Sequence, residues 1–168
     1  MSGGKRVLKY GCLTFFVSLL VLPLGFCGYL SWRGPRGALP KEIEWSDVLA
    51  FGSTFGLREG CSFGAYRISD KARYSLLWGG KLPAEWRQTP ITIRDGQYAD
   101  LGPDGSEITL YALHATDCAS AKARRYRLVE AYEHALGKPG SWVKIINHGE
   151  AMVVVSPQLG LAWFLNFG

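Results

Sequence analysis

The 168-residue sequence is poor in the residue patterns that build metal and catalytic sites. Its three histidines lie in no HExxH, CxxC or HxH arrangement, so a zinc site of familiar spacing is not predicted. Gly-x-Ser-x-Gly, phosphate-loop and dinucleotide-binding motifs are also missing. These absences predict no cofactor and no metal site, and they favour a non-catalytic role over an enzymatic one.

A large surplus of positive charge is also missing from most of the chain. The formal net charge is +5 at pH 7, but Lys5, Arg6 and Lys9 supply three of these charges. The remaining 16 Lys and Arg stand against 14 Asp and Glu, which leaves +2. This balance does not favour nucleic-acid binding. The two asparagines lie in no glycosylation sequon, which fits a bacterial source.

Residues 10–32 contain no charged side chain and are rich in Leu, Val and Phe. A helix of this length would span about 34 Å, enough to cross a hydrocarbon core of roughly 30 Å. Tyr10, Tyr29 and Trp32 lie near its ends, where aromatic rings settle at membrane interfaces. The pattern predicts a single-pass signal anchor after a cytoplasmic basic tail, residues 1–9, in a bacterial inner (plasma) membrane.

A linker, residues 33–43, would then lead to a periplasmic or extracellular domain, residues 44–168. A cleaved signal peptide is the alternative, with Leu13 to Leu22 as its apolar region and Gly25-Phe26-Cys27 as a poor cleavage site. Both interpretations export the same domain.

The exported domain is predicted to be α+β, with an antiparallel or mixed sheet and about three helices packed mainly on one face. Ser46 and Ser69 are expected to cap two short helices, and Asp95-Gly96 is expected to form a hairpin turn. The predicted helices cover residues 46–51, 70–78 and 118–136; the predicted strands cover residues 61–68, 91–94, 97–101, 107–114, 142–147, 151–156 and 161–167.

Only two of the four cysteines, Cys61 and Cys118, lie in the predicted exported domain. Two thiols in an oxidising compartment usually pair, so a disulfide between them is expected. The alternative makes Cys118 a nucleophile with His114 or His148 as its base, as in a small exported hydrolase or thiol enzyme. A paired Cys118 cannot act in that way.

The helix predicted over residues 118–136 carries a basic run, which most often is a solvated surface but is the best candidate contact for a protein partner. The run consists of Lys122, Arg124, Arg125 and Arg127. Five tryptophans follow the apolar segment, and core packing is the favoured role for each, with recognition of a partner as the alternative. Together these features suggest an envelope binding module, such as an assembly factor or an immunity-like inhibitor.

Overall fold

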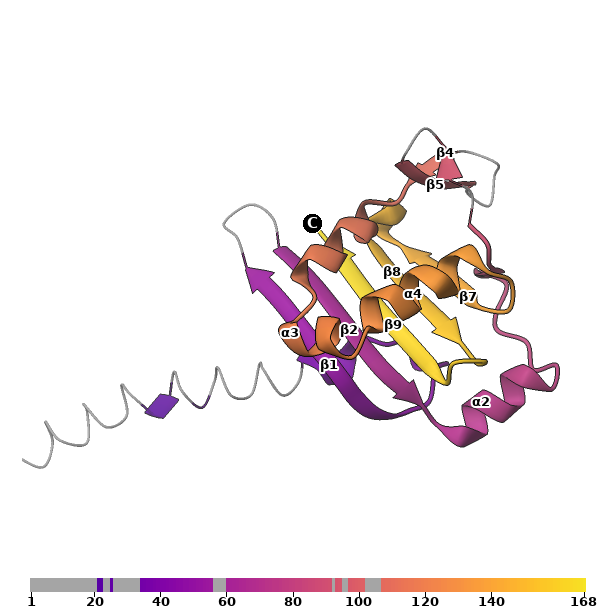
Figure 1. Cartoon of the computed structure of the whole chain (residues 1–168), viewed down its shortest axis with the longest axis horizontal. Helices are drawn as coiled ribbons and strands as arrows, with labels where there is room; N and C mark the ends of the chain where they lie inside the picture. The colour runs from indigo at the N-terminus through magenta and orange to yellow at the C-terminus, as the bar shows by residue number, and fades with distance from the viewer. Residues whose placement is uncertain are drawn as a thin grey trace, which may run out of the picture. The chain divides into compact units, whose positions relative to one another are not determined.

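The computed structural model describes residues 21, 22, 25, 34–55, 60–91, 93–94, 97–101 and 107–168. By its internal contacts the chain divides into two compact units, Met1–Gly37 and Ala38–Gly168. The second unit carries all of the strands described below (Figure 1).

The larger unit is built on a six-stranded antiparallel sheet with the order β1-β2-β9-β8-β7-β3. A three-stranded sheet with the order β4-β5-β6 lies beyond one end of it (Figure 1). The central strand β8 is buried along its whole length, which suits its run of Met and Val. The strands are β1 Trp45–Phe55, β2 Gly60–Ile68, β3 Trp86–Gln88, β4 Ile93–Arg94, β5 Gln97–Leu101, β6 Glu107–Thr109, β7 Trp142–Ile146, β8 Ala151–Ser156 and β9 Leu161–Phe167.

The large sheet buries apolar side chains on both faces. One face is covered by the 3₁₀ helix η1, Tyr111–Cys118, and by α3, Ala121–Arg125, and α4, Leu128–Gly137 (Figure 1). Residues Leu39 and Ile43 and the loop around Leu82 cover the other face. The short helix α2, Asp70–Leu77, leads from β2 into that loop. A second 3₁₀ element, the short turn η2, Asn147–Gly149, joins β7 to β8.

The predicted fold class is wrong. The structure is a six-stranded antiparallel sheet with a few short helices, and α4, with 10 residues, is the longest helix described. Ten residues cover only about 15 Å, half of a hydrocarbon core. Within the described part of the chain, no helix combines the length and the apolar character that a membrane crossing requires. The predicted anchor over residues 10–32 lies outside the described residues except at positions 21, 22 and 25.

The helix predicted from Ser46 is strand β1, and two β-bulges explain the error. The register with β2 shifts between Trp45 and Asp47 and again between Val48 and Ala50. Each bulge adds a residue, so Trp45, Val48 and Phe51 pack on the same face although they are three positions apart. A spacing of three imitates the period of a helix.

Two further predictions in the second half of the chain are wrong. The strand predicted over residues 107–114 ends at Thr109, and Ala112 and Ala115 are buried against the sheet from a 3₁₀ helix instead. The single helix predicted over residues 118–136 is two helices, because Arg127 adopts a left-handed conformation, φ 55°, between α3 and α4.

Other elements are confirmed. The strand predicted over residues 61–68 is β2, and the Ser69 hydroxyl accepts a hydrogen bond from the Ala72 amide at the start of α2. Strands β4 and β5 pair as an antiparallel hairpin, with Ile93 opposite Tyr98. The last three strands form the predicted antiparallel meander.

The middle of β7 is tied to two loops by a shared cation, the half-buried Lys144. The Lys144 amine lies 3.1 Å from a carboxylate oxygen of Glu42 and 3.1 Å from one of Glu85. The backbone amide of each glutamate and the Lys144 amine hold the pKa of both carboxyls below the usual 4.5. Burial lowers the pKa of Lys144, but the two carboxylates outweigh this effect and raise it.

These shifts predict a specific acid sensitivity. A carboxyl whose pKa is lower in the folded state stabilises the fold above the unfolded pKa, and the contribution is lost as the pH falls through the folded pKa. We expect the stability of the wild type to drop between about pH 5 and pH 3, and the Glu42→Gln/Glu85→Gln variant to drop less. Urea unfolding across this pH range measures the effect. The Lys144→Met variant should flatten the profile only in part, because the backbone amides still lower the pKa of both carboxyls. Equal profiles for all three proteins would contradict the prediction.

Candidate binding groove

The predicted disulfide between Cys61 and Cys118 is confirmed. It joins β2 to the end of η1 across 57 positions, with the two Cα atoms 6.0 Å apart. The Thr54 hydroxyl of β1 donates to the bonded sulfurs, 2.9 Å from Cys118 Sγ and 3.4 Å from Cys61 Sγ. The bridge therefore fixes η1 to the β1–β2 end of the large sheet.

Gly52 of β1 lies against the backbone of Cys118 and Ser120. A Cβ atom built at Gly52 would overlap the Cys118 carbonyl and would lie 2.8 Å from the Ser120 nitrogen. Strand β1 and the segment between η1 and α3 are thus close enough that no side chain fits between them.

The residues of the alternative thiol site do not form a catalytic group. Cys118 is held in the disulfide, and no hydrogen bond joins it to His114 or His148 in the part of the chain that is described. His114 is exposed and its ring centroid lies 5.5 Å from that of Phe167. His148 is exposed in the turn before β8, with φ 53°. Over the described ranges, no three His, Cys, Asp or Glu side chains gather as metal ligands.

The basic residues of the predicted partner surface are all exposed, on α3 and the turn after it. Two of them already have intramolecular contacts. Arg124 Nη2 donates to the carbonyls of Thr116 and Asp117, at 3.1 and 3.3 Å, and Arg127 lies 3.8 Å from Glu130. Lys122 and Arg125 make no such contact with a described residue, so they are the two charges best placed to meet another molecule.

A cluster of exposed apolar side chains lies on α2. Tyr74, Leu77 and Trp78 are 59%, 45% and 86% exposed, and their spacing of three and four residues places them on one side of the helix end. We call these three residues the α2 patch. Arg73 anchors this helix to the β8–β9 turn, because its guanidinium donates to the carbonyls of Pro157 and Gln158 at 3.1 and 3.3 Å.

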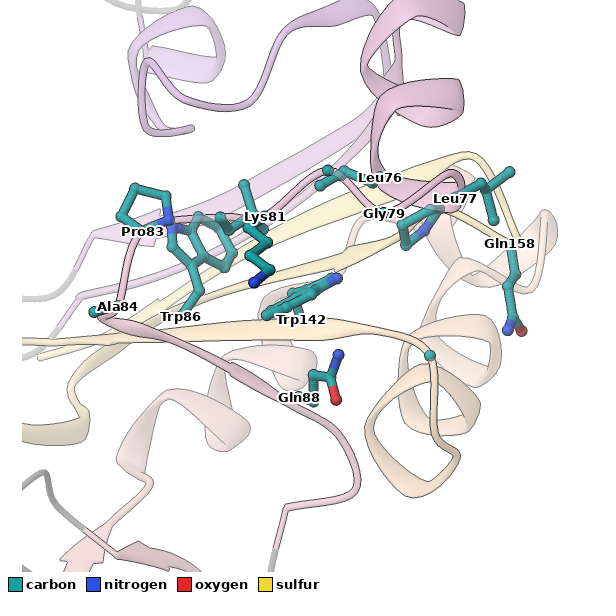
Figure 2. Close-up of a pocket in the computed structure, with 14 residues that line it drawn as sticks. Leu76, Leu77, Gly79, Lys81, Pro83, Ala84, Trp86, Gln88, Trp142 and Gln158 are labelled. Atoms are coloured by element: carbon teal, nitrogen blue, oxygen red, sulfur yellow. The ribbon is translucent and has the colours of Figure 1, made fainter.

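Beside the α2 patch lies a groove of about 560 Å³, here named the β3–β7 groove (Figure 2). This volume falls within the range of ligand-binding pockets. Its walls come from the end of α2, the loop that follows, strands β3 and β7, and the β8–β9 turn. Its principal side chains are Leu76, Lys81, Trp86, Gln88, Trp142 and Gln158.

Strand register brings the groove's aromatic and amide side chains together. Gln88 of β3 pairs directly with Trp142 of β7, and Trp86 pairs with Lys144. Residues two apart on a strand point to the same face, so both indoles and the Gln88 amide share one face of the sheet. The Lys144 amine lies 5.8 Å from the Trp86 ring centroid. Figure 2 shows Lys81 reaching toward the two indoles from the loop after α2.

Of the tryptophans after the apolar segment, Trp163 is fully buried and Trp78 is almost fully exposed, at 0% and 86%. Sequence reasoning favoured core packing for each of them and so missed both the α2 patch and the groove. The available signal was local: Trp78 precedes two glycines at a helix end, a place where a side chain is seldom covered.

Comparison of the chain with protein-family models, with curated proteins and with solved structures finds no match.

Proposed function

We propose that the Ala38–Gly168 unit is an exported, non-catalytic module that binds another protein of the cell envelope, as an assembly factor or inhibitor does. The α2 patch is the observation that carries this proposal. Large apolar side chains gathered on a protein surface are typical of contact sites, and Trp and Tyr are the residues that contribute most to binding. Trp78, at 86% exposed, contributes nothing to the core of this unit.

The disulfide supports the exported location. Disulfides persist in the periplasm and outside the cell, and they are rare in a reducing cytoplasm. The bond also removes the thiol that the enzymatic alternative needs, because Cys118 cannot attack a substrate while it is bonded to Cys61.

We expect the Tyr74→Ser/Trp78→Ser variant to lose a bound partner. Truncating two central aromatic contacts at an interface costs at least about 2 kcal/mol, or roughly 30-fold in affinity. The measurement is affinity capture of the full-length chain from an envelope extract of its own source, with quantification of proteins retained in stoichiometric amount. Wild type should retain such a protein, and the variant should not.

A matched control is available on η1 and at the end of α3. Tyr111 and Tyr126 are 51% and 63% exposed, near the ends of η1 and α3, so Tyr111→Ser/Tyr126→Ser removes comparable surface. This control should retain the partner. If the control loses the partner and the Tyr74→Ser/Trp78→Ser variant retains it, the partner does not bind the α2 patch. That result would favour the basic surface of Lys122 and Arg125. Circular dichroism must show that both variants fold.

A further inference from the structure

The polar groups that line the β3–β7 groove are mainly hydrogen-bond donors. Both indoles carry an N–H, Lys81 carries an ammonium group, and Gln88 and Gln158 each present an amide with two N–H bonds. The lining contains no Asp or Glu. Only the two glutamine carbonyls and backbone carbonyls can accept, so a ligand with many acceptors and few donors suits this surface best.

One of these donors is buried without an acceptor. Trp86 is 4% exposed, and its Nε1 has no hydrogen-bond partner within the described part of the chain. A buried polar group that lacks a partner costs roughly 1–3 kcal/mol. Such a cost is recovered when a bound molecule supplies the acceptor, so this indole points to a ligand.

A proline-rich peptide has the complementary chemistry. Proline has no backbone N–H, while its carbonyls stay free in the extended polyproline II conformation, which makes no internal hydrogen bonds. The flat pyrrolidine rings pack against aromatic side chains, and grooves lined by aromatic residues are the usual receptors for such segments. A sugar would bring as many donors as acceptors, and the groove has no carboxylate to receive them.

We propose that the β3–β7 groove binds a proline-rich extended segment of the partner protein, with prolines against the half-buried Trp142 and a peptide carbonyl directed toward the unpartnered N–H of Trp86. This inference rests on the proposed function and names the chemistry of the partner. Lys81 is the one charged side chain of the lining, so an acidic residue beside the prolines strengthens binding.

The test is a heteronuclear NMR titration of the full-length chain with a blocked nine-proline peptide. Indole N–H signals report each tryptophan separately once Trp→Phe variants have assigned them. The signals of Trp86 and Trp142 should shift and saturate, and those of Trp78 and the buried Trp163 should not. A blocked Gly-Ser peptide of equal length should cause no shift.

Variants separate the contacts. Trp86→Phe keeps an aromatic ring and removes the donor, so affinity should fall about tenfold. Trp142→Leu should weaken binding at least as much, because it removes the aromatic wall. Trp78→Ala is the matched control, since Trp78 does not line the groove, and it should bind as the wild type does.

Three results would overturn the inference: no shift at millimolar peptide, equal loss of binding in Trp78→Ala, or saturable shifts with chitotetraose in place of the peptide. Each leaves the proposed function to its own experiment, because that experiment changes Tyr74 and Trp78, neither of which lines the groove.

Discussion

Replacing Cys61 and Cys118 together with alanine is expected to lower the free energy of unfolding by about 4 kcal/mol. The bridge closes a loop across 57 positions, and the entropy removed from the unfolded chain grows with the logarithm of loop length. The lost bridge also frees η1, which covers one face of the sheet. A domain of this size is stabilised by only about 5–15 kcal/mol, so the variant should lose a large share of its stability.

Urea unfolding of the wild type and the variant, both without reductant, measures this difference. Thr54→Val is the control, because it removes the hydroxyl beside the sulfurs and leaves the bridge intact, and it should cost only about 1 kcal/mol. Adding reductant should bring the wild type to the midpoint of the variant. An unchanged midpoint after complete reduction would show that the bridge contributes little.

Trp163→Ala should destabilise the unit by about 3–5 kcal/mol, the range for a large aromatic side chain removed from a core. Trp163 is fully buried on β9 and its Nε1 donates to the Leu128 carbonyl, 3.0 Å away. Its ring also meets Tyr132 of α4 edge-on, with the centroids 6.1 Å apart. One side chain therefore joins the sheet to the helix that covers it.

Two further variants show how much of this loss comes from the hydrogen bond and how much depends on burial of the ring. Trp163→Phe keeps an aromatic ring but loses the hydrogen bond to the Leu128 carbonyl. It should therefore cost less than Trp163→Ala, about 1–3 kcal/mol. Trp78→Ala removes an indole that is 86% exposed and should change the free energy of unfolding by no more than about 0.5 kcal/mol. A similar loss of unfolding free energy in Trp78→Ala and Trp163→Ala would contradict the prediction that the exposed indole contributes far less to stability than the buried one.

The parts of the fold that the sequence predicted correctly are local. The meander of β7, β8 and β9 was predictable because short turns join three apolar strands, and the start of α2 because Ser69 is a good helix cap. The placement of β2 beside β9 was not, since these strands are separated by almost a hundred positions and no local pattern encodes their register.

The break between α3 and α4 shows a second reason for failure. Residues 121–137 contain no proline and no internal glycine, so helix propensity gives no sign of an interruption at Arg127. The interruption lets Ala123 from α3 and Leu128 from α4 both lie against the sheet, which is buried packing that propensity does not describe.

The candidate groove was hidden for the same reason. Its walls come from residues 76–88, from the start of β7 and from the β8–β9 turn, and only the sheet register brings Trp142 opposite Gln88. The tryptophans were recognised as possible recognition residues, but sequence alone did not separate the exposed Trp78 from the buried Trp163. The disulfide, in contrast, could be predicted from the number of cysteines in the exported domain and from the oxidising compartment alone.

The absence of a side chain at Gly52 limits which sequences can keep this bridge. A methyl group there would meet backbone atoms of Cys118 and Ser120, and that backbone is held by the bond to Cys61 and by the cap of α3. Neither neighbour can retreat without giving up a bond. A substitution at position 52 should therefore do less damage in a chain that has already lost its bridge, because the Cys118 backbone is then freer to move, so the effect of each change depends on whether the other came first.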